Sequence, residues 1–201
     1  LHLVHPELRD IVPRREQFAQ GPAWSRENLS QIRGGARAWQ QPPHNDIPFE
    51  KRMIAGAPGH PDVAIFIVNA KAGTSRPAIL YTHGGGYVLG SAEPSVRQLQ
   101  EICKALDCVA VSVDYRLAPE ATYRASIEDN YAGLKWLHAN AASIGADPAR
   151  IAVMGESAGG GHAAMLAIAA RDRGELPICF QCLIYPMLDD RTGSTRQMPP
   201  H

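Results

Sequence analysis

The sequence predicts an α/β fold in which a mostly parallel sheet carries helices on both faces. From residue 77 onward, short strand-like runs alternate with helix-like segments, which is the pattern of strands joined by helical crossovers. Several of these runs are continuously apolar, as expected for strands that are buried on both sides. The chain has 201 residues, of which 45% are hydrophobic and 20% charged, and this suits one domain with a sizeable core.

The first 45 residues differ from the rest, and we predict that they form a helical arm or cap segment. Residues 6–18 and 25–40 are predicted helices, the second from the helical spacing of its apolar residues, and Ser25 is a suitable N-cap for it. The run Gln41-Pro42-Pro43 ends the second helix. This pattern leaves open whether the arm packs on the core or covers an active site.

Residues 46–201 are predicted to form the core. Residues 52–57 and 63–70 form a β-hairpin across a turn that is rich in proline and glycine. The later strands are expected at residues 77–82, 108–113, 151–154 and 178–184. The helices are expected at residues 94–106, 126–139 and 158–170. Ligands of such sheets bind beyond the carboxyl ends of the strands, and the informative residues fall there.

A five-residue motif, Gly155-Glu156-Ser157-Ala158-Gly159, stands between a predicted strand and a predicted helix. A sharp turn in this context holds the serine in strained backbone geometry and presents its hydroxyl above the sheet. Glycines are needed two residues to either side because side chains there would collide, and the emerging helix N-terminus favours negative charge. We therefore predict that Ser157 is a nucleophile. The alternative is a glycine-rich turn with an incidental serine.

A second motif, His83-Gly84-Gly85-Gly86, follows directly on the strand predicted at residues 77–82. Acyl transfer develops negative charge on a carbonyl oxygen, and backbone N–H groups that point at this oxygen stabilise it. We expect Gly84 to shape the turn and His83 to pin the loop by hydrogen bonds, with a role as base less favoured. The predicted oxyanion donors are the N–H groups of Gly85, Gly86 and Ala158.

Four motifs together resemble a known family: His83-Gly84-Gly85-Gly86, Asp114-Tyr115-Arg116-Leu117-Ala118-Pro119-Glu120, Gly155-Glu156-Ser157-Ala158-Gly159-Gly160 and Tyr185-Pro186-Met187-Leu188-Asp189. In this order they resemble the hormone-sensitive-lipase-like carboxylesterases of the α/β-hydrolase superfamily, over about residues 77–190. The resemblance implies the α/β-hydrolase fold, activity on short-chain carboxylic esters and an N-terminal contribution to a cap. We expect Arg116 and Glu120 to tie a loop to the sheet.

The four motifs do not include the base that would activate Ser157 or the acid that would orient this base. A serine hydroxyl needs an adjacent base that a third group orients, and in this fold both follow the nucleophile, each after a later strand. One clear strand follows Ser157, so we expect the catalytic Asp and His beyond His201, with the C-terminal part of the fold lacking. Asp189 or Asp190 together with His201 is a less favoured local alternative, because chain ends are poorly positioned. For His162, packing or a local hydrogen bond is favoured over catalysis.

These observations predict a serine carboxylesterase that works through an acyl-enzyme intermediate and needs no cofactor and no metal. Two alternatives stay open. One is a hydrolase-fold protein that binds a small molecule without turnover, and the other is an acyltransferase that uses the same residues. The expected partner is a small-molecule ester substrate. A homodimer is the oligomeric state that we consider.

Charge and cysteine content argue against other classes. Twenty basic residues balance twenty acidic ones, so no field attracts nucleic acid or an anionic membrane. No apolar run approaches the roughly 20 residues that span a bilayer, and the start lacks a signal-peptide pattern, so we expect a cytoplasmic protein. Cys103, Cys108, Cys179 and Cys182 are expected to be buried, inert thiols rather than a zinc or redox site.

Overall fold

The computed structural model describes residues 4–11, 25–37 and 41–191, and the chain divides into two compact units, Leu1–Gly35 and Ala36–His201. In the first unit, η1 (Pro6–Ile11) is a 3-10 helix where we expect an α-helix over residues 6–18, the second half of which lies outside the described residues.

Helix α2 (Leu29–Arg37) is shorter than the predicted helix over residues 25–40. The turn before it is closed by a reciprocal pair of hydrogen bonds. The Asn28 N–H donates to Ser25 Oγ over 3.4 Å, and the Ser25 N–H donates to Asn28 Oδ1 over 2.9 Å. Ser25 therefore closes the turn before α2, and the prediction that it is the N-cap is wrong because the helix begins four residues later, at Leu29.

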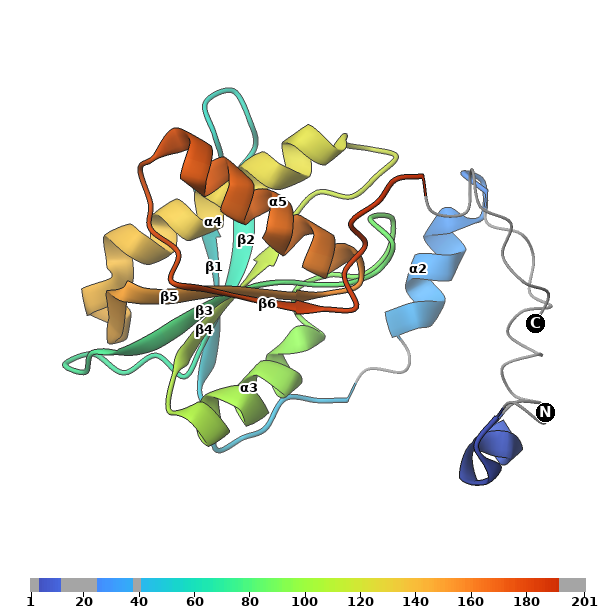
Figure 1. Cartoon of the computed structure of the whole chain (residues 1–201), viewed down its shortest axis with the longest axis horizontal. Coiled ribbons are helices and arrows are strands. Elements are labelled where there is room, and N and C mark those ends of the chain that lie inside the picture. Colours follow the sequence, from blue (N-terminus) through green and yellow to red (C-terminus); the bar gives the residue numbers. More distant parts are fainter. Residues whose placement is uncertain (1–3, 12–24, 38–40, 192–201) are drawn as a thin grey trace. The chain divides into compact units, whose positions relative to one another are not determined.

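The second unit is built on one six-stranded sheet in the order β1-β2-β4-β3-β5-β6 (Figure 1). Its strands are β1 (Phe49–Ile54), β2 (Val63–Val68), β3 (Arg76–Thr82), β4 (Val109–Asp114), β5 (Ala146–Glu156) and β6 (Phe180–Ile184). β2 pairs antiparallel with both β1 and β4, and the remaining neighbours β4, β3, β5 and β6 are parallel. The predicted mostly parallel sheet is confirmed.

Helices cover both faces of this sheet, as predicted (Figure 1). They are α3 (Ser95–Leu106), α4 (Tyr123–Ile144) and α5 (Ala158–Arg173). One core cluster lies between the sheet and α4 and α5, and a second lies between the sheet and α3. Burial of these apolar side chains is the main term that stabilises the unit.

Several elements extend further than the apolar pattern indicates. β5 begins at Ala146, ahead of the predicted residue 151, because Ala146 pairs with Arg76 before the apolar run starts. β1 begins at Phe49, which pairs with Val68 across the hairpin. Ladder hydrogen bonds do not require apolar side chains, so polar strand ends are invisible to a hydrophobic pattern.

The cysteine prediction needs one correction. Cys103 and Cys108 are buried, with their Sγ atoms 3.8 Å apart, but Cys179 is exposed and Cys182 is half-buried. Cys179 directly precedes β6, which lies at one edge of the sheet, so less of the described chain covers it. None of the described residues form a group of three metal-binding side chains. No helix in the described part of the chain combines the length and the apolar character needed to cross a membrane.

Candidate active site

Ser157 lies at the turn between β5 and α5, with φ 54° and ψ −120°. Backbone geometry of this kind costs a residue with a side chain about 1–3 kcal/mol and persists only where its surroundings hold it. Here the Ser157 N–H donates to the carbonyl of Ile184 over 2.9 Å. The Ser157 carbonyl accepts from Gly161 over 3.1 Å and from Met187 over 2.9 Å. Three backbone hydrogen bonds therefore hold the strained turn.

The two glycines that flank the serine allow a close approach between β3 and α5. A Cβ at Gly159 would overlap the carbonyl oxygens of Thr82 and His83, and a Cβ at Gly155 would overlap the carbonyl of Gly159. The Thr82 hydroxyl donates to the Gly159 carbonyl over 2.7 Å and ties the end of β3 to the start of α5. Only glycine permits this backbone contact.

The loop after β3 brings the triglycine motif beside the nucleophile turn. Gly85 and Gly86 both have positive φ, 127° and 61°. Gly84 faces Glu156, since a Cβ at Gly84 would lie 3.1 Å from the Glu156 carbonyl oxygen. The Glu156 carboxylate accepts a hydrogen bond from the Tyr185 hydroxyl over 3.1 Å. Residues on β3, β5 and β6 thus meet at the carboxyl ends of their strands.

The three predicted oxyanion donors have their directions fixed by the carbonyl that precedes each of them. A peptide unit is planar, so an N–H points away from the carbonyl of the preceding residue. Each of these three carbonyls accepts a hydrogen bond. The Gly84 carbonyl lies 2.8 Å from His83 Nδ1. The Gly85 carbonyl accepts from the N–H groups of Val88 and Leu89 over 3.1 and 2.8 Å. The Ser157 carbonyl accepts from Gly161 and Met187, as described above. Within the described part of the chain, none of the three donor N–H groups makes a hydrogen bond itself.

The two histidines nearest the serine are both buried. His83 is 3% exposed and its Nδ1 contacts the Gly84 carbonyl, so in the neutral ring Nδ1 carries the hydrogen. Burial lowers the pKa of His83 and favours this neutral form. His162 is fully buried, and burial together with the nearby His83 lowers its pKa to about 4. Both histidines are therefore placed as neutral packing groups beneath the loop.

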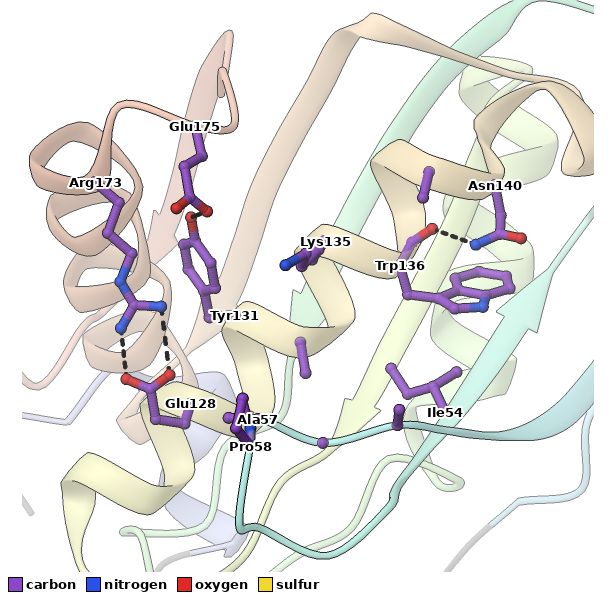
Figure 2. A pocket seen from close by; sticks show the side chains of 14 residues that line it. Ile54, Ala57, Pro58, Glu128, Tyr131, Lys135, Trp136, Asn140, Arg173 and Glu175 are labelled. Carbon is purple, nitrogen blue, oxygen red and sulfur yellow. Dashed lines mark hydrogen bonds and ion pairs between the residues drawn. The ribbon is translucent and has the colours of Figure 1, made fainter.

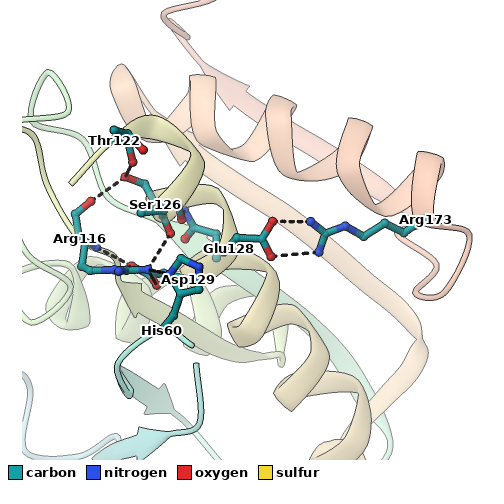
Figure 3. A network of polar contacts seen from close by, with 9 residues as sticks. His60, Arg116, Thr122, Ser126, Glu128, Asp129 and Arg173 are labelled. Carbon is teal, nitrogen blue, oxygen red and sulfur yellow. Dashed lines mark hydrogen bonds and ion pairs between the residues drawn. The ribbon is translucent and has the colours of Figure 1, made fainter. Parts of the chain in front are cut away.

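Arg116 of the Asp114–Glu120 motif joins a polar network with α4 and the β1–β2 turn (Figure 3). The Arg116 guanidinium donates to both carboxylate oxygens of Asp129 over 2.8 Å and lies 2.7 Å from the His60 ring. Asp129 is buried on α4, and His60 belongs to the β1–β2 turn. The prediction that Arg116 ties a loop to the sheet therefore needs correction, because its partners lie on a helix and in a hairpin turn.

Of the local candidates for acid and base, the structure describes the two aspartates. The Asp189 carboxylate is exposed and forms an ion pair with Arg191 over 2.8 Å. Asp190 is also exposed, and His201 lies outside the described residues.

A cavity of about 590 Å³ lies away from these motifs, between residues 54–58, α4 and the segment after α5 (Figure 2). None of the predicted site residues line it. Its charged groups largely satisfy one another. Arg173 forms an ion pair with Glu128 at 2.5 Å and lies 3.9 Å from the centre of the Tyr131 ring, and the Tyr131 hydroxyl donates to Glu175 over 2.9 Å. The cavity therefore offers no group for the chemistry that the motifs predict.

Two residues of the site were given no role of their own by the sequence, although Tyr115 belongs to the motif at residues 114–120. The Tyr115 hydroxyl donates to the His83 carbonyl over 2.6 Å. Gly90 has φ 90°, and a Cβ there would lie 2.7 Å from His83 Nδ1. Gly90 could have been found as a further glycine in the same loop. The motif at residues 114–120 marks Tyr115 but not its contact with His83, because the two residues are far apart in the chain.

Comparison with known proteins agrees with this geometry. Residues 79–200 match the family described as alpha/beta hydrolase fold. Esterase LipI of Mycobacterium tuberculosis is 38% identical over 181 residues, which cover 90% of this chain and 55% of LipI. Carboxylesterase NlhH of the same species is 37% identical, over 89% of this chain and 54% of NlhH. A solved structure titled Bacterial Heroin Esterase superposes with a TM-score of 0.84 at 34% identity, over 96% of this chain and 61% of that one.

The chain belongs to the α/β-hydrolase family, and its resemblance to the hormone-sensitive-lipase-like esterases within that family is confirmed. It spans about half the length of the curated relatives LipI and NlhH.

Proposed function

We propose that this protein is a serine carboxylesterase that hydrolyses short-chain carboxylic esters through an acyl-enzyme intermediate. The observation that carries the proposal is the position of Ser157. Its turn is strained, and its carbonyl and those of Gly84 and Gly85 are hydrogen-bonded so that three N–H groups next to it have fixed directions. The named activities of the relatives support the same reaction class.

In the proposed reaction, Ser157 Oγ attacks the ester carbonyl and its proton passes to a base. The oxyanion that forms accepts hydrogen bonds from Gly85, Gly86 and Ala158, and the N-terminus of α5 adds a favourable dipole. Collapse of this intermediate expels the alcohol and leaves an ester of Ser157. Water then releases the acid and restores the serine.

The base and its acid partner are proposed to come from outside the described residues. His83 is committed to the Gly84 carbonyl, and His162 is enclosed by aromatic rings. Neither ring offers an exposed nitrogen to the serine hydroxyl. A downstream His, oriented by an Asp, fits the chain order of this fold.

The proposal of a short acyl group rests on the close backbone packing around the nucleophile. The backbone bonds from Ser157 to Ile184 and Met187 hold the segment after β6 against the turn. The close approach of the triglycine backbone to the substrate carbonyl favours compact acyl groups.

Covalent labelling with a fluorophosphonate tests the proposal. We would treat this 201-residue chain, the full-length protein and its Ser157→Ala variant, and map the modified peptide by mass spectrometry. We expect labelling at Ser157 in the full-length protein and none in the variant, together with loss of p-nitrophenyl butyrate hydrolysis.

The other outcomes separate the alternatives. Full-length protein that is folded but neither labelled nor active would favour the non-catalytic binding protein. Labelling at Ser157 with acyl transfer to an added alcohol in preference to water would favour the acyltransferase. Equal labelling of the 201-residue chain would show that a group within it activates the serine.

A further inference from the structure

We infer that Tyr115 is a positioning residue for the oxyanion hole, acting through His83 on the N–H of Gly85. This inference rests on the proposed function, because it assigns a role in the same site. Tyr115 follows β4 and is 3% exposed, so its ring is enclosed by the fold.

Tyr115 holds residue 83 in two ways. Its ring stacks on the His83 ring with a centroid distance of 4.2 Å and an interplanar angle of 10°. Its hydroxyl donates to the His83 backbone carbonyl over 2.6 Å. One residue from β4 therefore fixes both the side chain and the backbone of the residue that opens the triglycine loop.

The position of the His83 ring affects the oxyanion donor through the peptide unit between Gly84 and Gly85. With the ring held by Tyr115, His83 Nδ1 lies 2.8 Å from the Gly84 carbonyl oxygen. That carbonyl shares its peptide plane with the Gly85 N–H, which must point the opposite way. A change in the tilt of the His83 ring would rotate this plane and turn the donor away from the substrate oxygen.

The packing around the ring pair leaves it little freedom. The His162 ring meets Tyr115 edge-on at 4.5 Å and Tyr87 edge-on at 4.8 Å. On the other side, Gly90 lets the chain pass so close to His83 that a Cβ there would lie 2.7 Å from Nδ1. Burial raises the pKa of the Tyr115 hydroxyl, so it remains a neutral donor.

The ring of Tyr115 fills space in the core, whereas its hydroxyl group has a role beyond packing. A phenylalanine would fill the same space and keep the stacking, so what the oxygen adds is its hydrogen bond to the carbonyl of residue 83. Removing it releases the His83 carbonyl, so that the His83 backbone can shift and the Nδ1 contact that holds the Gly84–Gly85 peptide shifts with it, while the core stays filled. This separates a positioning role from a role in stability alone.

The test is Tyr115→Phe in the full-length protein, assayed with p-nitrophenyl butyrate. We expect kcat to fall by about 10-fold with KM within about twofold of wild type, because complete loss of one oxyanion donor lowers kcat by roughly 100-fold or more. The inhibition constant of a trifluoromethyl ketone, which forms a tetrahedral oxyanion with serine, should rise by the same factor as kcat/KM falls.

Tyr81→Phe is the matched control. Tyr81 is also fully buried, and its ring belongs to the core cluster on the face of the sheet that α3 covers. The control loses the same atom from a comparable environment and should keep the wild-type kcat. A Tyr115→Phe variant with the kcat of Tyr81→Phe and a similar loss of Tm would overturn the inference.

Amide hydrogen exchange over residues 83–90 gives a readout that does not depend on turnover. Exchange should be faster in Tyr115→Phe than in wild type or Tyr81→Phe, and equal rates in all three would also overturn the inference.

Failure of the proposed function would give a different set of results from failure of this inference. In that case wild-type protein hydrolyses no ester, or Ser157→Ala hydrolyses it as fast, and no oxyanion hole exists for Tyr115 to position.

Discussion

The Arg116–Asp129 ion pair offers the sharpest test of how the site is supported. The Asp129 side chain is 1% exposed and accepts hydrogen bonds from the Arg116 backbone N–H, from Nε and from the guanidinium terminus, all between 2.8 and 2.9 Å (Figure 3). Asp129→Asn keeps the shape of the side chain. It replaces one acceptor oxygen with an NH2 group that faces the donors of Arg116.

The magnitude follows from burial. Removing one partner of a buried ion pair costs about 3–5 kcal/mol, because the other charge is left without compensation. The Arg116 side chain is 30% exposed, so water shields part of its charge. We therefore expect Asp129→Asn to lower the free energy of unfolding by about 2–4 kcal/mol, and Tm by roughly 2–4 °C for each kcal/mol.

Urea denaturation followed by circular dichroism measures this difference, with Glu128→Gln as the matched control. Glu128 is the neighbouring residue on α4, and its ion pair with Arg173 is partly exposed on both sides, at 29% and 34%. Such pairs contribute about 0.2–1 kcal/mol. If Asp129→Asn costs no more than Glu128→Gln, the reasoning about burial is refuted.

Three further predictions address the nucleophile turn, the buried histidine and the substrate. Gly159→Ala should cost about 1–3 kcal/mol of stability and most of the esterase activity, because its Cβ would overlap the carbonyl of Thr82. Gly34→Ala, which has open space around it, should be neutral or stabilising, and chemical denaturation distinguishes the two. The pKa of His162 is about 4 in the fold, against an ordinary 6.5. Folding therefore favours the neutral ring, and stability should fall as pH drops from about 6.5 to 4, by about 3 kcal/mol in total. His162→Gln should flatten that part of the pH profile of unfolding, while His5→Gln, at an exposed position, should leave it unchanged. In full-length protein, p-nitrophenyl acetate and butyrate should have kcat/KM values at least about 10-fold above that of the palmitate ester, and a preference for palmitate would contradict the short-chain proposal.

Much of the fold could be predicted from the sequence because each element carries its own signal. The continuous apolar runs gave the parallel strands, and the glycines at positions 155 and 159 marked a turn in which two backbones touch. The exposure of Cys179 was missed for a physical reason. A short apolar run has the same composition whether or not other elements pack over its strand, so the burial of each side chain is known only from the assembled sheet.

In the candidate site, the oxyanion donors could be predicted from the sequence and the groups that orient them could not. Oxyanion donors are backbone groups, so a glycine-rich loop reveals where they are without revealing what holds them. Their orientation depends on the Tyr115 hydroxyl, whose bond to the His83 carbonyl joins two strands across 32 positions of the chain. No spacing rule connects such residues, because the contact is created by the pairing of β3 with β4. A sequence motif thus identifies the atoms that bind charge, whereas the groups that aim those atoms become visible only when the sheet is assembled.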